Sequence, residues 1–247
     1  MANETAAHFD AVRELGAAGF RGRLLVEKPL FQKVAAFPRA HFSEVCVAYN
    51  LRFHPVLAAL HALLKDETPI SASVYVGQYL PDWRPGSDYR QSYSAVGEQG
   101  GGVLRDLSHD IDYACWLLGR WKRVAALGGK FSDLEISSDD CFALLFETER
   151  CPVVTVQMSY LDRVPRRQIV INTRNQTFCA DLVANRLTVG SERRDITVER
   201  DTTYRAMHEA ILRGDGSVAC NVEEAMDILR LIEAAEQAAT SGNWVVR

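Results

Sequence analysis

A helix that follows three glycines carries the residues best suited to acid–base chemistry. Residues 100–119 read GGGVLRDLSHDIDYACWLLG, and at about 100° per residue Asp106, His109 and Tyr113 fall within a narrow arc. An Asp one turn from a His can orient and tune the imidazole, and a His that titrates near neutrality suits general-base catalysis on an alcohol. The alternative is that this arc is the polar face of an ordinary helix.

A lysine stands at the end of an apolar run and directly before a proline. The segment RLLVEKP at 23–29 predicts a short strand that ends near Lys28. In α/β sheets, ligands bind outside the carboxyl ends of the strands. Lys28 could therefore hold or protonate the oxygen of a substrate hydroxyl or carbonyl. A surface lysine at a strand end is the alternative.

Two further groups could bind a carbohydrate. The segment 81–94 contains Trp83, Tyr89 and Tyr93 among charged residues. Aromatic faces with interleaved hydrogen-bonding groups suit sugar rings, and they equally suit a protein interface. Asn50 and Arg52 end a predicted strand and could point into the same cleft, or they could be solvated at a sheet edge.

The elements that must position these residues change in character along the chain. Helical and strand patterns alternate at first, with a helix at 5–18 capped by Thr5 or Asn3 and a strand at 44–53. Apolar residues then recur with period two. The remaining predicted elements are a helix from 55, a strand at 71–80, a helix at 103–118, strands near 121–131, 140–148, 152–161, 167–173, 176–182 and 185–190, and helices near 201–213 and 222–240.

This pattern predicts an α/β remnant followed by an α+β domain. Residues 1–48 are expected to form the C-terminal remnant of a Rossmann-like dinucleotide-binding domain. Residues 49–247 are expected to form a mostly antiparallel open-sheet domain for substrate binding and oligomerisation, with a final strand that could return to the first domain.

Composition excludes several function classes. The formal net charge of −4 argues against nucleic-acid and anionic-membrane partners. The densest basic group, Arg163, Arg166 and Arg167, is interpreted as a solvated loop before a strand. Six scattered cysteines show neither a CxxC nor a metal-ligand spacing, and the charged N-terminus is not a signal peptide. We expect a cytoplasmic chain without disulfides or a metal site.

Three motifs in order give the chain a family resemblance. VEKPL at 26–30, AYNLRFHP at 48–55 and GGG-x3-D-x2-HDID at 100–112 resemble the Gfo/Idh/MocA oxidoreductases, which include glucose–fructose oxidoreductase and inositol dehydrogenase. The resemblance implies NAD or NADP as cofactor and hydride transfer to or from a ring carbon of a sugar, a cyclitol or a nucleotide-sugar-like substrate. It also implies a homodimer or homotetramer formed through the open sheet face.

The resemblance also implies roles for individual residues. Lys28 would bind and polarise the reacting oxygen, and Asp106 and His109 would form the catalytic pair, with His109 as proton acceptor. The family commonly shows Asp-x-x-x-His, whereas the spacing here, Asp106-Leu-Ser-His109, is one residue shorter. Two explanations remain: the helix register is shifted, or Asp110 or Asp112 takes part instead. The implied cofactor contacts are Asn3, Glu27, Lys28 and Pro29, with a Lys28–Pro29 bond that could be cis. The candidate substrate contacts are Asn50, Arg52, Trp83, Tyr89, Tyr93, Asp110 and Tyr113.

One expected motif is missing from the sequence. No G-x-G-x-x-G occurs, although that segment supplies the helix N-terminal amides that bind the pyrophosphate. The opening residues resemble the end of the fourth strand of the family's cofactor domain. We therefore expect an N-terminally truncated chain that binds cofactor poorly and is inactive alone, so whether it is an enzyme stays open. The alternative is a non-catalytic sugar-binding or oligomerisation module that has lost its cofactor domain.

Overall fold

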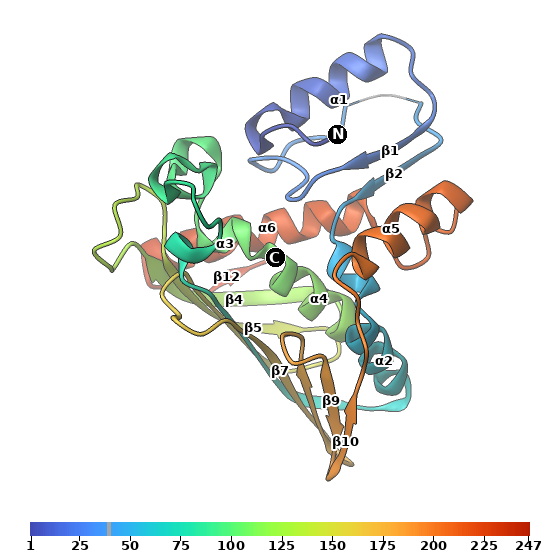
Figure 1. The fold of residues 1–247 in the computed structure, drawn as a ribbon, viewed down its shortest axis with the longest axis vertical. Coiled ribbons are helices and arrows are strands. Elements are labelled where there is room, and N and C mark those ends of the chain that lie inside the picture. The colour runs from blue at the N-terminus through green and yellow to red at the C-terminus, as the bar shows by residue number, and fades with distance from the viewer. Residues whose placement is uncertain (39–40) are drawn as a thin grey trace.

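Two sheets organise the chain in the computed structural model, which describes residues 1–38 and 41–247 (Figure 1). The helices are α1 (His8–Ala17), α2 (Pro55–Leu63), α3 (Val103–Asp106), α4 (Ser108–Leu118), α5 (Thr202–Arg213) and α6 (Val222–Ser241). The strands are β1 (Arg23–Val26), β2 (Glu44–Val47), β3 (Pro69–Gly77), β4 (Trp121–Gly129), β5 (Cys141–Thr148), β6 (Val153–Ser159), β7 (Arg166–Thr173), β8 (Thr177–Asp181), β9 (Arg186–Val189), β10 (Glu192–Asp195), β11 (Cys220–Asn221) and β12 (Val245–Val246). Short 3-10 turns are η1 (Thr5–Ala7), η2 (Asn50–Phe53), η3 (Leu64–Asp66), η4 (Leu80–Asp82), η5 (Tyr89–Gln91), η6 (Tyr93–Ala95) and η7 (Gly97–Gln99).

The smaller sheet has the order β1-β2-β11, with β1 and β2 parallel and β11 antiparallel to β2. The predicted helix at 5–18 is confirmed as η1 followed by α1, but the predicted cap is wrong. Glu4 occupies the N-cap position of η1 without a side-chain bond, and Thr5 is buried. The reason is that the chain enters α1 through a 3-10 turn, which places Thr5 inside the helical run.

The larger sheet has the order β10-β9-β8-β7-β3-β6-β5-β4-β12. All its pairings are antiparallel except the one between β3 and β6. The predicted period-two strands are confirmed, but β10 was not predicted. Its four residues are all exposed, so it lacks the apolar alternation from which a strand is recognised.

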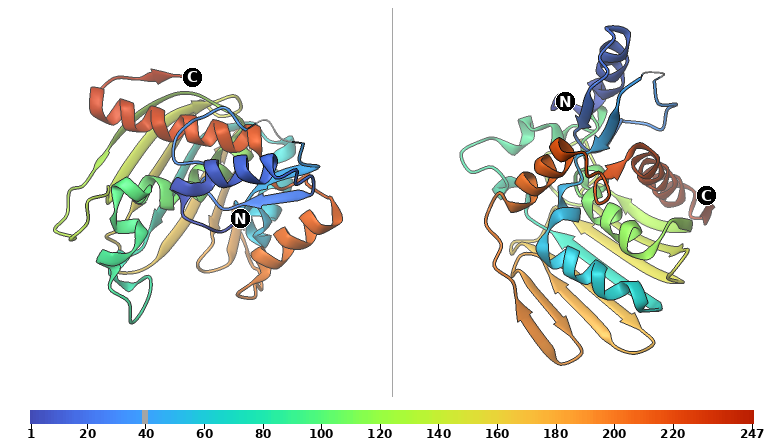
Figure 2. Two further views of the ribbon diagram at one scale, coloured as in Figure 1. Left: turned by 90° about the horizontal axis from the view of Figure 1, so that it is seen from above. Right: turned by 90° about the vertical axis from the view of Figure 1, so that its right-hand side faces the viewer.

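The helices cover one face of the large sheet and leave the other face open (Figure 2). In β5, Phe142, Leu144 and Phe146 are buried, whereas the intervening Leu145 is 40% exposed. Leu127 of β4 is 71% exposed on the same open face, which forms a shallow cavity of about 500 Å³ over β3, β4, β5 and β6. The sheet therefore has one core-facing side and one apolar side without a covering layer in the chain.

The final strand does not return to the first unit. β12 pairs with β4 in the large sheet, and the strand that returns to the small sheet is β11, where Cys220 pairs with Val47. The physical reason is that α6 begins beside β11 and β2 and then runs along β4, so that the chain after it reaches the free edge of β4. Residues on both sides of position 48 thus contribute to the small sheet.

Glycines allow the segment before α3 to pack closely. A Cβ on Gly101 would lie 2.0 Å from the carbonyl oxygen of Tyr93, and Gly102 has φ of +117°. This packing lets the Leu104 amide donate to the Asp139 carboxylate at 2.9 Å. Burial raises the pKa of Asp139 to about 6, and the bond from Leu104 partly opposes that rise. Asp139 thereby fixes the start of the helix that carries the candidate site.

Among the residues that the structure describes, no helix combines the length and apolar character needed to cross a membrane.

Candidate active site

Lys28 lies just beyond the carboxyl end of β1, as the strand pattern predicts. Its ammonium donates a hydrogen bond to the backbone carbonyl of Asp106 at 2.6 Å. Burial lowers the pKa of Lys28, and the carboxylates of Asp106 and Glu27 partly oppose this effect. A contact across 78 positions of sequence therefore places a half-buried amine against the end of α3.

The predicted single helix at 103–118 is wrong, because it breaks at Leu107. That residue has φ −93° and ψ +19°, so α3 ends at Asp106 and α4 begins at Ser108. The Asp106 carboxylate accepts a hydrogen bond from the Tyr160 hydroxyl at 2.6 Å, and no hydrogen bond of the described residues joins Asp106 to His109. The break thus turns the expected Asp–His pair into two groups with separate partners.

His109 lies against the edge of the Tyr49 ring, with 5.6 Å between the ring centroids. Its Nδ1 is buried and has no hydrogen-bond partner among the described residues. Burial lowers the pKa of His109 well below its usual 6.5, and the positive charges of Lys28 and Arg167 lower it further. The imidazole is therefore neutral at physiological pH, which is the form that can accept a proton.

Arg167 is a site residue that the sequence interpretation missed. Arg166 and Arg167 open β7 instead of lying in a loop, and the Arg167 guanidinium lies 3.2 Å from the Asp110 carboxylate. Period-two alternation could have found it, because Arg167 shares a strand face with the buried Ile169 and Ile171. An arginine on the core-facing side of a strand needs a partner, and Asp110 is that partner.

Asp110 and Tyr113 expose almost no surface. Tyr113 donates a hydrogen bond to Asp110, and burial raises the pKa of Asp110 while Arg167 and Tyr113 oppose the rise. Both residues were predicted to contact substrate, and in the structure they contact each other and orient Arg167. A direct role in substrate binding stays a prediction.

A cavity of about 350 Å³ adjoins His109 and Arg167. Its other walls include residues of η2, of the segment before α5 and of the start of α5. Asn50 of η2 is one of these residues, and its side-chain amide donates a hydrogen bond to the Thr203 hydroxyl at 2.8 Å. A smaller cavity of about 130 Å³ shares Arg167 and His54 with the first. The predicted residues Asn50 and His109 are therefore brought to one cavity.

Arg52 is not at this cavity. The predicted strand at 44–53 is wrong beyond Val47, because Asn50 and Arg52 lie in the 3-10 turn η2. The Arg52 side chain is 3% exposed and forms ion pairs with Asp112 at 2.6 Å and Glu224 at 3.0 Å. The turn reverses the chain so that the buried guanidinium meets both carboxylates. Asp112 is thus engaged with Arg52 and makes no hydrogen bond to His109.

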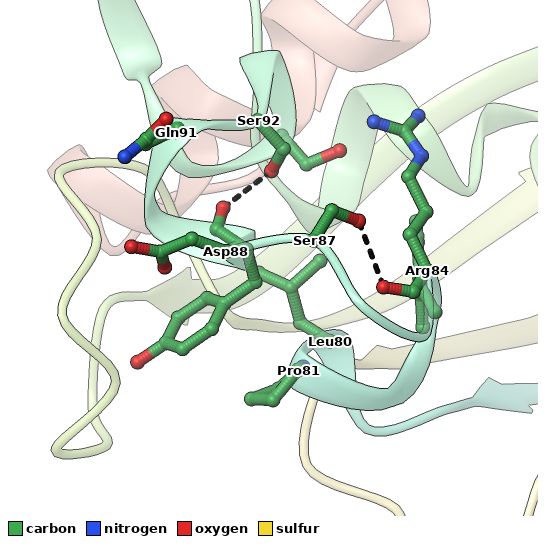
Figure 3. A pocket seen from close by; sticks show the side chains of 10 residues that line it. Leu80, Pro81, Arg84, Ser87, Asp88, Gln91 and Ser92 are labelled. Atoms are coloured by element: carbon green, nitrogen blue, oxygen red, sulfur yellow. Dashed lines mark hydrogen bonds between the residues drawn. The ribbon is translucent and has the colours of Figure 1, made fainter.

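The aromatic loop lies on the other side of Asp106. Trp83 packs edge-on against Tyr160, with ring centroids 5.2 Å apart, and burial followed by the nearby Asp106 carboxylate raises the pKa of Tyr93. Trp83 and Tyr89 line a separate cavity of about 200 Å³, seen in Figure 3 beside Ser87 and Arg84. Trp83 and Tyr93 thus lie at the Asp106–Tyr160 end of the site, whereas the Tyr89 hydroxyl accepts a hydrogen bond from the Glu135 amide.

The residues expected to contact a cofactor, Asn3 and 27–29, are connected to each other through His8. The Lys28–Pro29 peptide bond is cis. His8, which the sequence interpretation missed, is buried, with Nδ1 3.1 Å from the Pro29 carbonyl oxygen and Nε2 3.0 Å from that of Asn3. The Lys28 amide lies 3.3 Å from the Glu27 carboxylate. His8 therefore ties the opening residues to the turn that carries Lys28.

Comparisons with known proteins agree with this architecture. Residues 68–178 match the family model of the GFO/IDH/MocA C-terminal domain. This segment of the chain is therefore similar to a Gfo/Idh/MocA C-terminal domain. The motif GGG-x3-D-x2-HDID lies inside the matched range, so the family resemblance is confirmed there. A sequence comparison with curated proteins finds no significant match.

Solved structures share the fold over the whole chain. Levoglucosan dehydrogenase in complex with NADH and levoglucosan has a TM-score of 0.84 and 15% identity, covering 100% of this chain and 78% of its own. An oxidoreductase from Agrobacterium radiobacter in complex with NAD+, L-tartaric acid and magnesium has a TM-score of 0.82 and 20% identity, covering 99% and 78%. An inositol dehydrogenase homologue from Azotobacter vinelandii complexed with NAD+ has a TM-score of 0.81 and 18% identity, covering 100% and 77%. The arrangement of a small mixed sheet and a large open sheet is therefore shared with these structures.

The first prediction concerns Arg52. Arg52→Met should lower the free energy of unfolding by about 3–5 kcal/mol, because it leaves Asp112 buried and unpaired. Urea unfolding followed by circular dichroism measures this change. Arg120→Met is the matched control, since its partner Glu223 and Arg120 itself are both largely exposed, and it should change stability little. Equal effects of the two variants would contradict a structural role for Arg52.

The second prediction concerns the titration of His109. Lys28→Met removes a positive charge that disfavours the imidazolium, so the pKa of His109 should rise. Proton NMR of the histidine C2 resonance across a pH series measures it, and a His109→Asn spectrum assigns the signal. The exposed Lys33→Met should leave the pKa unchanged. No movement in Lys28→Met would show that the two groups are not coupled.

Proposed function

We propose that this chain belongs to an NAD(P)-dependent oxidoreductase that transfers hydride between the cofactor and a hydroxyl or carbonyl carbon of a sugar or sugar derivative. The observation that carries the proposal is the meeting of Lys28 and His109 from distant parts of the chain. One is a half-buried amine whose charge lowers the pKa of His109, and the other is a neutral imidazole with an unpartnered Nδ1, on a residue that lines a cavity. Titratable groups with perturbed pKa values beside a cavity are candidates for acid–base catalysis.

The two side chains have complementary tasks in this proposal. Lys28 uses one ammonium hydrogen on the Asp106 carbonyl, so its remaining hydrogens are free to bind the reacting oxygen. In the direction of oxidation, His109 accepts the proton of the substrate hydroxyl. A nicotinamide, when bound, exchanges the hydride. Asn3, Glu27 and Pro29 would hold the nicotinamide end, because they surround the turn that carries Lys28.

The sequence lacks the glycine-rich motif that commonly binds a dinucleotide's pyrophosphate. No G-x-G-x-x-G occurs in the sequence, so the amides that such a loop would supply are missing from the 247 residues. We therefore propose that this chain alone binds only the nicotinamide end, weakly, and is inactive at ordinary cofactor concentrations.

The third prediction compares two cofactors on the whole chain. Reduced nicotinamide mononucleotide and NADH should bind with dissociation constants within about threefold of each other, because the adenosine half finds no partner. Lys28→Met should weaken both, and Lys33→Met should not. Tryptophan fluorescence and saturation-transfer NMR measure the binding. If NADH binds about a hundredfold more tightly than the mononucleotide, the chain does contain a pyrophosphate site. If a folded chain binds neither compound, the proposed nicotinamide site is refuted.

The same solutions test the redox function. At saturating cofactor, oxidation of a panel of aldoses, uronic acids and cyclitols should be slow but measurable through the absorbance of the reduced nicotinamide. His109→Asn should lower the rate by about 10²–10⁴-fold, because a general base typically contributes a rate enhancement of that size. The exposed His41→Asn is the control. Saturable cofactor binding with no oxidation of any sugar would favour the non-catalytic sugar-binding module.

We also propose that the open face of the large sheet joins copies of this chain. Support comes from its apolar character, with Leu127 at 71% and Leu145 at 40% exposed above a continuous antiparallel surface. Exposed apolar patches of this kind mark interaction surfaces.

The fourth prediction tests this surface. Leu127→Glu should convert a dimer or tetramer into a monomer, because it places a charge in the middle of the apolar face. Size-exclusion chromatography with light scattering measures the mass. Leu212→Glu on α5 is the matched control, since Leu212 is 77% exposed away from the sheet. A wild-type chain that is already monomeric would refute the proposal.

A further inference from the structure

The two cavities beside His109 are lined by an excess of basic side chains. Together their walls contain three charged arginines, Arg166, Arg167 and Arg200, and Glu199 is their one acidic residue. His54 and His109 also line them, but burial lowers the pKa of both, so they do not contribute to this charge. The chain as a whole has a formal net charge of −4. A basic cavity in an acidic protein is a local feature, and local charge of one sign attracts ligands of the other.

Existing ion pairs leave part of this charge available. Arg166 lies 3.6 Å from Asp162, and Glu199 lies 3.8 Å from Arg205 outside the cavity walls. Arg200 makes no ion pair with a described residue. Asp110 is buried behind Arg167 and does not line either cavity, so it orients the guanidinium without covering its cavity side.

The Arg167 guanidinium itself is only partly satisfied. One terminal nitrogen faces Asp110, whereas Nε is buried and has no hydrogen-bond partner among the described residues. The other terminal nitrogen makes no hydrogen bond with a described residue and is not among the buried atoms, so a ligand in the cavity can supply its acceptor. Guanidinium groups bind carboxylate and phosphate oxygens with two parallel hydrogen bonds, so an anionic group is the acceptor that fits best.

The position of Arg167 is rigid. Its backbone pairs with Val76 in the centre of the large sheet, and its carbonyl accepts from the Leu182 amide at 2.9 Å. Both cavities share this side chain, and the larger one also contains His109. A group bound by Arg167 would therefore hold the rest of a small ligand beside the proposed base, which is the arrangement needed for specificity.

We propose that the substrate carries an anionic group, a carboxylate or a phosphate, that binds to Arg167 with help from Arg200, while its reacting hydroxyl lies at His109. This inference rests on the proposed function and adds the substrate class: an acidic sugar or a sugar phosphate. Arg167 is then the residue that selects acidic substrates over neutral ones.

The fifth prediction compares three ligands of one ring type on the whole chain. D-glucuronate, D-glucose 6-phosphate and D-glucose are titrated by calorimetry and by ligand-observed NMR. At least one anionic ligand should bind about tenfold or more tightly than glucose, and this preference should shrink as salt is added. The tighter of the two anions identifies the group as carboxylate or phosphate.

Variants separate recognition from folding. Arg167→Gln should abolish the preference, and Arg200→Gln should reduce it. Arg174→Gln, an exposed arginine just beyond the far end of β7, should leave it intact. Asp110→Asn keeps Arg167 but removes its negative neighbour, so a folded Asp110→Asn chain should bind the anion at least as tightly as the wild type. Loss of anion binding in a folded Asp110→Asn chain would mean that the ion pair is only structural, and would overturn the inference.

The failure of this inference can be told from failure of the proposed function. Equal binding of glucose and both anions would overturn the anionic substrate and leave the oxidoreductase intact. Absence of binding by all three sugars would also overturn it, and the cofactor titration described above would then decide the proposed function independently.

Discussion

An ammonium group that is largely removed from water must find an acceptor, and that requirement joins the two parts of this molecule. Lys28 follows β1 of the small sheet, and its hydrogen bond to the Asp106 carbonyl crosses to the helices that cover the large sheet. The carbonyl is available because α3 ends at Asp106, where the last carbonyls of a helix lack intrahelical partners. The helix break and the lysine thus satisfy each other. Without the break, the Lys28 amine would face a carbonyl already used inside a helix.

The same break distributes the polar side chains of this region among different partners. The Asp106 carboxylate accepts a hydrogen bond from Tyr160. Asp110 pairs with Arg167 and accepts a hydrogen bond from Tyr113, and Asp112 pairs with Arg52. His109 retains a buried Nδ1 that has no hydrogen-bond partner among the described residues. Three carboxylates within seven residues are each engaged, so the histidine is not oriented by any of them. Its edge-on contact with Tyr49 holds the ring instead.

Local pattern in the sequence was sufficient for most of the secondary structure. Period-two alternation located the strands of the large sheet, and a helical stripe located α6, because one face of each element is buried. It failed where tertiary contacts override propensity. The turn at Asn50–Phe53 exists because Arg52 must reach Asp112 and Glu224, and these partners lie 60 and 172 positions away. No local pattern encodes such a contact. The predicted site was incomplete for the same reason. Arg167 is recognised as a site residue only through its contact with Asp110, and His8 only through its contact with the Pro29 carbonyl.

The electrostatics of the site follow from one permanent charge and two adjustable ones. A guanidinium stays charged at any physiological pH, so Arg167 is a fixed cation. Burial lowers the pKa of Lys28, and both cations together with burial keep His109 neutral. A fixed cation is suited to binding, whereas groups with lowered pKa are suited to exchanging or sharing protons. The residue that sets the charge of the cavity is thus separate from the residues placed to act on the oxygen, and the sheet and the helix break hold the two kinds of group side by side.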